Sequence, residues 1–264
     1  MHSEGEDEAD QQLIIEDRAG IRAITMHRPE AGNAIHQRMA IRIADAVRHI
    51  DDGIRCVVLG SSGRTFCAGA DLAMLEGLGA PEQAQVVRDH VYGGFQAPVM
   101  AIAECPVPVI AAVQGPALGA GADLVLACDV RIASTSAWLE ETWIKLGVIS
   151  ALGAAVTLSH SMGPSDALDV LLSARRLSAE ECLARGLYQR LVAPDDLVRS
   201  VDDYAAMVAS RDGDAVRALK RLIRHAPDPA HLRDGLEAAL DEQVPLIART
   251  SFAARVRELR RRVR

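Results

Sequence analysis

Hydrophobic and polar positions near the N-terminus predict a hairpin, a helix and a buried strand. The β-rich runs Leu13–Ile15 and Ile21–Met26 are separated by the polar segment EDRAG, which is typical of a β-hairpin. Apolar positions three or four residues apart then predict an amphipathic helix with Asn33 as its N-cap. Its apolar side carries Ile35, Met39, Ile43, Val47 and Ile50. The apolar run in Arg55–Leu59 predicts a strand buried on both faces.

The middle of the chain repeats an order of strand, turn and helix. Val107–Val113 predicts another buried strand, and Asp129–Ala133 predicts a short one after a helical stretch. This order favours an α/β fold. Pro81–Gly93 indicates a mobile polar helix or loop, and an extended conformation of Ala137–Ile144 is one hypothesis for that segment.

The last seventy residues have a helical pattern. From Asp195 onward it is interrupted at Gly213, Pro227 and Pro229, and one apolar face carries Leu232, Leu236, Leu240, Val244 and Ile247. Before it, Ser178–Glu181 has capping-box spacing and Gly186 ends a helix. We therefore expect an acidic, disordered tail over residues 1–12, an α/β core over 13–194 and a helical region over 195–264.

Composition narrows the class of protein without naming a function. The 264 residues are 49% hydrophobic and 25% charged, as in ordinary globular proteins. The net charge of −7 argues against nucleic-acid binding, and the seven arginines in Arg249–Arg264 have no aromatic platform beside them. Five cysteines without CxxC spacing indicate a reducing compartment and no metal site. With no signal pattern and no membrane-length apolar segment, we expect a cytoplasmic protein.

Two glycine-containing turns carry the candidate chemistry. Thr65–Leu72 reads TFCAGADL and Gly115–Asp129 reads GPALGAGADLVLACD, each after an apolar run and before a helical pattern. The first N–H groups of a helix have no partner inside it, and the helix dipole adds positive charge there. Two such turns can form an oxyanion hole for one carbonyl oxygen. Asp123 follows within one turn of the second site.

Five segments in order resemble the crotonase, or enoyl-CoA hydratase/isomerase, superfamily. They are Met26–Ile35, Val57–Leu72, Gly115–Ser134, Leu146–Ala154 and Ser161–Val192. The resemblance implies an α/β spiral of ββα units followed by a helical C-terminal trimerisation region, and a homotrimer or a dimer of trimers. It also implies an acyl-CoA substrate and no metal or redox cofactor, because coenzyme A is part of the substrate. A helical region that packs only on its own core is the alternative.

The resemblance assigns roles to residues of the two turns. It places the oxyanion N–H groups on Ala70 and Ala120, and the first catalytic carboxylate on Asp123, where hydratases usually have glutamate. Tight packing turns are the alternative for the first two residues. For Asp123 the alternative is a first-turn acid that complements the helix dipole.

The second carboxylate departs from the family pattern. Trp143 stands at its position, and tryptophan is not a general acid or base. If the segment is extended, Glu141 lies on the same side as Trp143, because side chains alternate. Glu141 is therefore the candidate second acid, with a surface glutamate as the alternative. We expect Trp143 to line the acyl pocket and Trp138 to pack in the core.

Coenzyme A is expected to lie against two loops. The resemblance points to Arg28 and Ala31 in one loop and to the backbone of Ala68, Gly69, Asp71 and Leu72 in the other. Arg28 suits a phosphate, because a guanidinium makes bidentate contacts, but a solvent-exposed salt bridge explains it equally well. Arginines in Arg255–Arg264 are candidates to reach the coenzyme A of a neighbouring subunit. Cys67 is more typical of a small packing residue than of a nucleophile.

The sequence predicts an acyl-CoA enzyme that hydrates a trans-2-enoyl-CoA or moves its double bond. Within the same fold, another isomerase, a decarboxylase or a hydrolase stays open. An acyl-CoA-binding protein with little catalysis is the alternative of a different class.

Overall fold

The computed structural model describes residues 12–77, 87–88, 93–225, 240, 244 and 247–263. The predicted tail up to residue 11, most of Pro81–Gly93, and the face positions Leu232 and Leu236 lie outside these residues. Leu240 and Ile247 of the same face are buried, as the pattern predicts.

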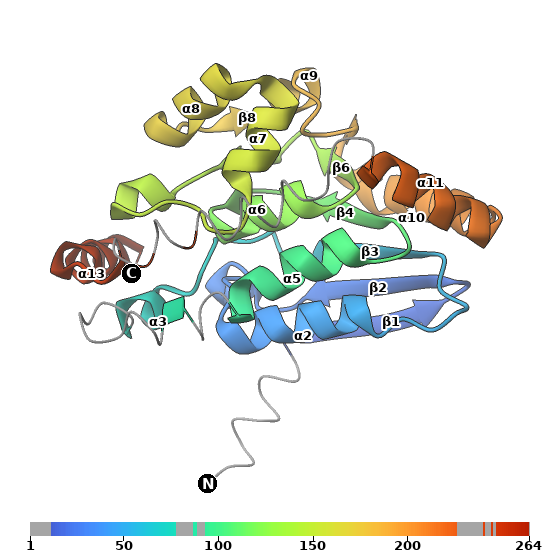
Figure 1. Cartoon of the computed structure of the whole chain (residues 1–264), viewed down its shortest axis with the longest axis horizontal. Coiled ribbons are helices and arrows are strands. Elements are labelled where there is room, and N and C mark those ends of the chain that lie inside the picture. Colours follow the sequence, from blue (N-terminus) through green and yellow to red (C-terminus); the bar gives the residue numbers. More distant parts are fainter. Residues whose placement is uncertain are drawn as a thin grey trace, which may run out of the picture.

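A six-stranded sheet forms the centre of the fold (Figure 1). Its strands, in spatial order, are β1 (Leu13–Arg18), β2 (Ile21–Met26), β3 (Cys56–Ser61), β4 (Val109–Val113), β6 (Val130–Ser134) and β9 (Arg190–Val192). β1 and β2 form the predicted antiparallel hairpin, and the other neighbours are parallel. The predicted strands and the α/β class are confirmed.

Helices cover both faces of this sheet. α2 (Gln37–Arg48) and α5 (Gly93–Glu104) pack together on one face, and α10 (Leu197–Ala209) packs on the other, against β3, β4 and β6. Alternate residues of β4 serve the two layers: Val109 and Ala111 join the main core, and Ile110 joins the cluster under α10. Both faces are therefore apolar, which explains why the strands read as continuous hydrophobic runs.

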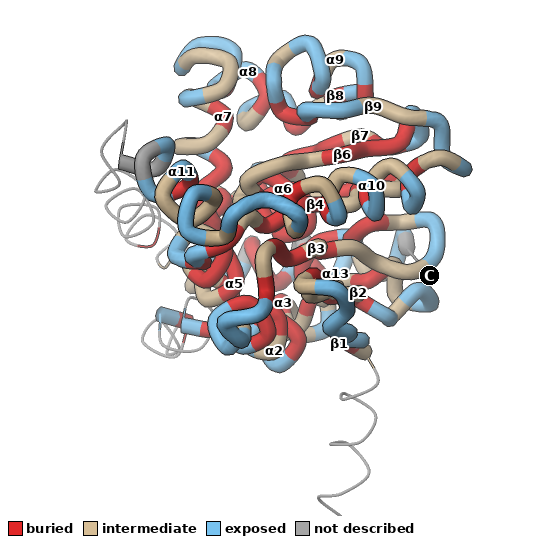
Figure 2. The backbone as a smooth tube through the Cα atoms, turned by 90° about the vertical axis from the view of Figure 1, so that its right-hand side faces the viewer, coloured by how far each residue is buried: buried red, intermediate tan, exposed pale blue. Residues whose placement is uncertain are grey.

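A smaller sheet and four helices form the second layer of the core. The sheet contains β5 (Ala117–Leu118), β7 (Trp138–Glu140) and β8 (Leu177–Ser178). The helices are α6 (Ala120–Ala127), α7 (Ala154–Met162), α8 (Pro164–Ser173) and α9 (Ala179–Ala184). α6 is buried in the centre, whereas α8 and α9 expose their outer sides (Figure 2). The Ser178 hydroxyl accepts the Glu181 N–H at 3.2 Å, which confirms the predicted N-cap of α9.

The C-terminal region is helical, as predicted. After η5 (Pro194–Asp196) and α10 come α11 (Gly213–His225) and α13 (Thr250–Val263). Lys220 of α11 is buried, and its ammonium donates to Asp129 and to the Val107 carbonyl, each at 2.6 Å. α13 packs against α3 (Leu72–Gly77) and η4 (Trp143–Leu146) of the same chain.

Two local predictions are wrong. The N-cap of α2 is His36, whose Nδ1 accepts the Met39 N–H at 3.3 Å. Asn33 is instead fully buried with a positive φ of 56°, and its amide donates to the carbonyls of Ser62 and Thr65. Asparagine tolerates this backbone conformation, so its polar side chain ties two loops together rather than capping the helix.

The segment Ala137–Ile144 is also not extended throughout. β7 ends at Glu140, and the 3-10 helix η4 begins at Trp143. Gly147, with a φ of 75°, ends η4, and its N–H donates to the Ile144 carbonyl. A left-handed glycine of this kind closes a helical turn, which strand periodicity does not register.

Candidate active site

The first glycine-containing turn is held against a short loop, η1 (Pro29–Ala31) and the residues after it. The Ile35 N–H donates to the Gly69 carbonyl, and the Asp71 N–H donates to the Ile35 carbonyl, each at 2.8 Å. These bonds pass over Ala70, because successive N–H groups of an extended segment point in opposite directions. Within the described part of the chain, the Ala70 N–H makes no hydrogen bond. It is available to an oxygen of a ligand.

The second turn joins β5 to α6 through Gly119. This residue has a φ of 47° and a ψ of −117°, a conformation that favours glycine. A Cβ there would lie 2.9 Å from the Thr142 hydroxyl oxygen. Ala120 is the first residue of α6, so its N–H has no acceptor within the helix, and none is found among the other described residues.

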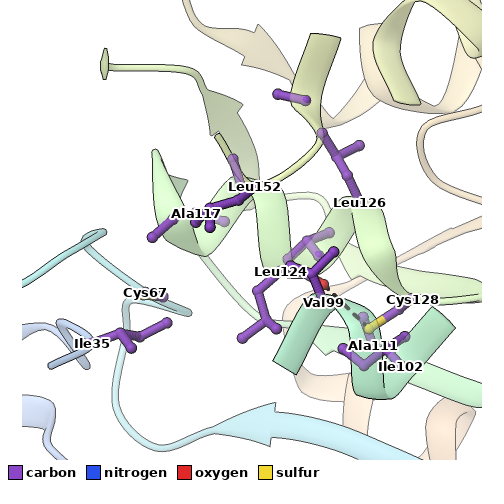
Figure 3. Packing of buried hydrophobic residues seen from close by; sticks show 14 of the residues in the cluster. Ile35, Cys67, Val99, Ile102, Ala111, Ala117, Leu124, Leu126, Cys128 and Leu152 are labelled. Carbon is purple, nitrogen blue, oxygen red and sulfur yellow. Dashed lines mark hydrogen bonds between the residues drawn. The ribbon is translucent and has the colours of Figure 1, made fainter. Parts of the chain in front are cut away.

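The main chain joins the two turns directly. The Cys67 N–H donates to the Pro116 carbonyl at 3.2 Å, and the Leu118 N–H donates to the Cys67 carbonyl at 2.9 Å. Figure 3 shows Cys67 of the first segment and Ala117 and Leu124 of the second in one packed cluster, with Ile35 from the loop beside the first turn. The two turns therefore form one structural unit.

Glycines permit the closest contacts between these turns. A Cβ on Gly121 would lie 2.6 Å from the Cys67 carbonyl oxygen, and a Cβ on Gly69 would lie 4.0 Å from the Ala120 nitrogen. The structure thus brings the predicted oxyanion residues, Ala70 and Ala120, to the same place. Their binding of a thioester oxygen stays a prediction.

Asp123 lies on the first turn of α6 and is only 2% exposed. Its Oδ1 accepts the Ser150 hydroxyl at 2.7 Å and the Ala154 N–H at 3.0 Å, and its Oδ2 accepts the Trp143 indole N–H at 3.0 Å. Burial raises the pKa of Asp123 to about 6, and these three donors oppose the rise. Asp123 is therefore mostly anionic at neutral pH and close to its titration range.

Glu141 is 4% exposed, and neither of its carboxyl oxygens has a hydrogen-bond partner among the described residues. Burial raises its pKa well above the ordinary value, and the negative charge of Asp123 raises it further. Both effects favour the protonated form of Glu141. A surface glutamate is excluded, and the two acids are neighbours in different environments.

Three donors to Asp123 were not found by sequence reasoning. Trp143 was expected to line a pocket, and it is buried, but its indole N–H also binds Asp123. Ser150 and the Ala154 N–H come from the segment that leads into α7. A serine within the apolar run GVISALGA was the available signal, because a buried hydroxyl needs a partner. Trp138, expected in the core, is half-buried, and the Arg176 guanidinium stacks on its ring.

Arg28 forms an ion pair with Asp71. Its Nη1 donates to Asp71 Oδ2 at 2.7 Å and to the Ala34 carbonyl at 3.1 Å, and both charged side chains are partly buried. Burial opposes ionisation of Asp71, but hydrogen bonds from Arg28 and from the start of α3 leave its pKa lowered. The pair is the salt bridge of the alternative interpretation, although it is not solvent-exposed. A contact of Arg28 with a phosphate stays a prediction.

The other candidate residues for coenzyme A meet at the junction of the same two loops. Ala31 ends η1, and the Ala68 N–H donates to the Gly32 carbonyl at 2.8 Å. Gly69 is next in the turn, and Leu72 begins α3. The structure therefore brings these residues together and leaves their ligand as a prediction.

The C-terminal arginines have partners in their own chain. Arg260 of α13 pairs with Glu76 of α3, and Arg261 and Arg262 pair with Glu258. A contact with a neighbouring subunit's coenzyme A therefore stays a prediction.

Other kinds of site receive no support from the described residues. Burial raises the pKa of Cys67 to about 12, so its thiol is not poised as a nucleophile. Among these residues there is no cluster of three or more histidine, cysteine or acidic side chains that could hold a metal ion. The helices in the described ranges are too short or too polar to cross a membrane.

Comparison with known proteins identifies the family. The sequence model of the enoyl-CoA hydratase/isomerase family matches residues 16–256. The chain is 36% identical over 212 residues to a probable enoyl-CoA hydratase, EchA14, of Mycobacterium tuberculosis, covering 79% of this chain and 80% of that one. It is 30% identical over 242 residues to the crotonyl-CoA hydratase of Syntrophomonas wolfei, covering 90% of this chain and 87% of that one.

Solved structures agree with this result. The crystal structure of an enoyl-CoA hydratase from Mycobacterium avium subsp. paratuberculosis superposes with a TM-score of 0.85 at 29% identity, covering 93% of this chain and 98% of that one. The predicted crotonase-type α/β fold is confirmed. The protein is an enzyme of this type, and the chain belongs to the enoyl-CoA hydratase/isomerase family.

Proposed function

We propose that this protein adds water to the double bond of a trans-2-enoyl-CoA. The observation that carries the proposal is the pair of buried carboxyl groups, Asp123 with three hydrogen-bond donors and Glu141 with none among the described residues, next to two turns that each have an N–H group without an acceptor there. The names of the relatives, enoyl-CoA hydratase and crotonyl-CoA hydratase, support the same substrate class.

The two turns would hold the thioester carbonyl oxygen. The N–H groups of Ala70 and Ala120 donate to it and stabilise the negative charge that develops when water attacks. Because the main chain fixes both donors before the substrate arrives, little reorganisation is needed in the transition state. Loss of one such donor typically lowers the rate by about 100-fold or more.

The two acids would divide the proton transfers. Asp123 removes a proton from water while the water oxygen bonds to C3, and the electrons of the double bond move onto the thioester as an enolate. Glu141 then donates its proton to C2, which restores the thioester. A proton passes from Asp123 to Glu141 and returns both groups to their starting states. Two neighbouring acids with different environments suit this division.

The remaining substrate contacts follow from the same placement. We place coenzyme A along the loops of Ala31, Ala68, Gly69 and Leu72, with Arg28 and Asp71 at their junction, and the acyl chain beside Trp143. In this proposal the reaction uses no metal or redox cofactor, because coenzyme A is part of the substrate.

We also propose a homotrimer, or a dimer of trimers, in the cytoplasm. Exposed apolar side chains on α8 and α11 support association: Leu168 and Leu172 on the first helix, and Leu219 and Ile223 on the second. None of the five cysteines, all of which lie in the described ranges, forms a disulfide, which supports a reducing compartment. A role in fatty acyl-CoA metabolism follows from the proposed substrate.

Double-bond isomerisation is the second candidate. Trp143 replaces the usual second carboxylate, and a different placement of the acid favours a different proton destination. Moving a double bond needs a base and an acid but no water in the product.

The test is to mix the purified protein with crotonyl-CoA and to follow the absorbance of the conjugated thioester. The mass of the product is then measured by mass spectrometry. We expect loss of absorbance and a product heavier by one water. Asp123→Asn and Glu141→Gln should each slow turnover by about 100-fold or more, because each removes one proton transfer. The exposed-site variants Asp202→Asn and Glu16→Gln should react like wild type.

Two results would contradict hydration. A product of unchanged mass would establish the isomerase. If calorimetry shows that crotonyl-CoA binds, but neither it nor its 3-enoyl isomer is turned over, the protein is an acyl-CoA-binding protein rather than a hydratase.

A further inference from the structure

Trp143 contacts Asp123 in a way that neither the family pattern nor the proposed chemistry explains. Trp143 is the first residue of η4, and its indole Nε1–H donates to Asp123 Oδ2 at 3.0 Å. The ring lies against Gly119, since a Cβ there would be in ordinary van der Waals contact, at 3.6 Å, with Trp143 Cε2 and Nε1. The indole is thus fixed between the second turn and the carboxylate, and it is 9% exposed.

The indole N–H is the donor to one particular oxygen. Asp123 Oδ1 is shared by Ser150 and the Ala154 N–H, whereas Oδ2 receives its hydrogen bond from Trp143. Three donors on a buried carboxylate fix both its rotation and its charge, because each donor favours the anion. Glu141 is the titratable group that interacts electrostatically with Asp123 from the described elements packed around α6.

The contrast between the two acids follows from these donors. Glu141 is equally buried but has no donor on either oxygen in the described residues. Two adjacent carboxyl groups do not both ionise in a buried site, so the one with donors ionises first. The indole N–H therefore helps to decide which acid is the anion.

We propose that Trp143 is a positioning residue that acts through Asp123: its indole N–H fixes Oδ2 and keeps Asp123, rather than Glu141, as the group that accepts the proton. The assignment of a catalytic proton transfer to Asp123 rests on the proposed function. The hydrogen bond and its effect on ionisation do not, so they are tested first without substrate.

The chain offers a direct probe, because it contains two tryptophans. In the Trp138→Phe variant, Trp143 is the sole source of indole fluorescence. We expect its emission to titrate with a midpoint near the Asp123 pKa of about 6. Asp123→Asn in the same background should abolish this titration, whereas Glu141→Gln should leave its midpoint almost unchanged, since the proposal keeps Glu141 neutral there.

Two outcomes of the titration overturn the proposal. A titration that survives Asp123→Asn shows that another group acts on the indole. A titration that Glu141→Gln abolishes shows that Glu141 is the first acid to ionise. Both results are independent of whether the protein hydrates anything.

The second measurement is the pH dependence of turnover. Trp143→Phe keeps an aromatic ring and removes the N–H, which raises the pKa of Asp123. The base must be ionised, so the acidic limb of the kcat profile should move to higher pH by about one unit. The matched control Trp138→Phe should not move it, because that ring packs with Arg176 away from Asp123.

A positioning role and a purely structural role of Trp143 predict different pH dependences of the turnover rate. If Trp143 acts through ionisation of Asp123, the Trp143→Phe variant loses about 5-fold in kcat near pH 6 and about 10-fold near pH 5, with little change in KM, and recovers toward wild type at pH 8 or above. A loss that is equal at all pH values contradicts the proposal. If wild type has no hydratase activity, the proposed function fails, and the fluorescence titration alone decides the role of Trp143.

Discussion

Glu140 and Glu141 are adjacent in sequence and both buried, yet their surroundings differ completely. Glu140 is 6% exposed and pairs with Lys145 and with Arg176 Nε at 3.1 Å. Glu141 has no partner in the described residues and faces the charge of Asp123. One carboxyl group therefore has two cationic partners, whereas burial and the charge of Asp123 favour the neutral form of the other at a cost to stability.

This difference predicts opposite effects of the same substitution. The unfolded chain ionises Glu141 near its ordinary pKa of 4.5, whereas the pKa of Glu141 in the folded protein is raised well above that value, so stability falls as pH rises above 4.5. Glu141→Gln removes this loss and should raise Tm relative to wild type at pH 8, with the gain shrinking toward pH 4.5. Thermal unfolding at several pH values measures it.

Glu140→Gln is the matched control for this measurement. It leaves Lys145 and Arg176 without their shared partner, so its Tm should be lower than that of wild type at pH 8. If Glu141→Gln lowers Tm at pH 8 as much as Glu140→Gln does, Glu141 is ionised and usefully paired in the folded protein.

At the scale of elements, the site depends on how closely the first turn approaches α6. The Leu118 N–H donates a hydrogen bond to the Cys67 carbonyl, and Gly121 lies directly against Cys67. No side chain of the turn needs to be polar for this arrangement. Backbone packing alone sets the separation of the Ala70 and Ala120 N–H groups.

Gly121→Ala should therefore separate the two turns. Its Cβ would lie 2.6 Å from both the Cβ and the carbonyl oxygen of Cys67, a contact that side-chain rotation does not relieve. We expect turnover of the enoyl-CoA to fall by about 100-fold or more, as for a lost oxyanion donor. Gly53→Ala, at a glycine with open space around it, should leave the rate unchanged. Normal turnover in Gly121→Ala would show that catalysis does not depend on the spacing of the Ala70 and Ala120 N–H groups.

The elements and part of the candidate site were predictable from the sequence. The strands and both turns follow from local pattern and family motifs, and the predicted acids Asp123 and Glu141 are buried side by side, although their catalytic roles stay predictions. Glu141 was reached through a wrong premise, since Ala137–Ile144 is not extended. The roles of Trp143 and Ser150 were missed because these residues lie 20 and 27 positions from Asp123. Their contacts depend on how the segment before α7 folds back, which no local pattern encodes.

At the scale of the whole molecule, the apolar surface is uneven. Pairs of leucine and isoleucine side chains stand one helical turn apart on α8 and α11, and each is more than half exposed. α11 is firmly attached to the core through the buried Lys220 and Asp129 contact. A rigid helix with an apolar stripe is suited to contact another copy of the chain.

Light scattering should give the mass of three or six chains of 28.3 kDa. One variant replaces both Leu219 and Ile223 of α11 by glutamate, and a second replaces both Leu168 and Leu172 of α8. The variant whose helix lies at the interface should shift the mass toward that of a monomer. Ile14→Glu, a single exposed position on β1, is the control. A monomeric wild type at micromolar concentration would contradict the proposed assembly.

The bridge between Cys67 and Ala117 has a consequence for how such an enzyme changes during evolution. In the proposed mechanism the main chain makes the carbonyl-binding part, so substitutions that keep the small residues leave it intact. Side chains from separate segments make the proposed proton-transfer part, and each can be exchanged alone. Lineages that share this scaffold can therefore acquire new reactions without rebuilding the part that activates the thioester.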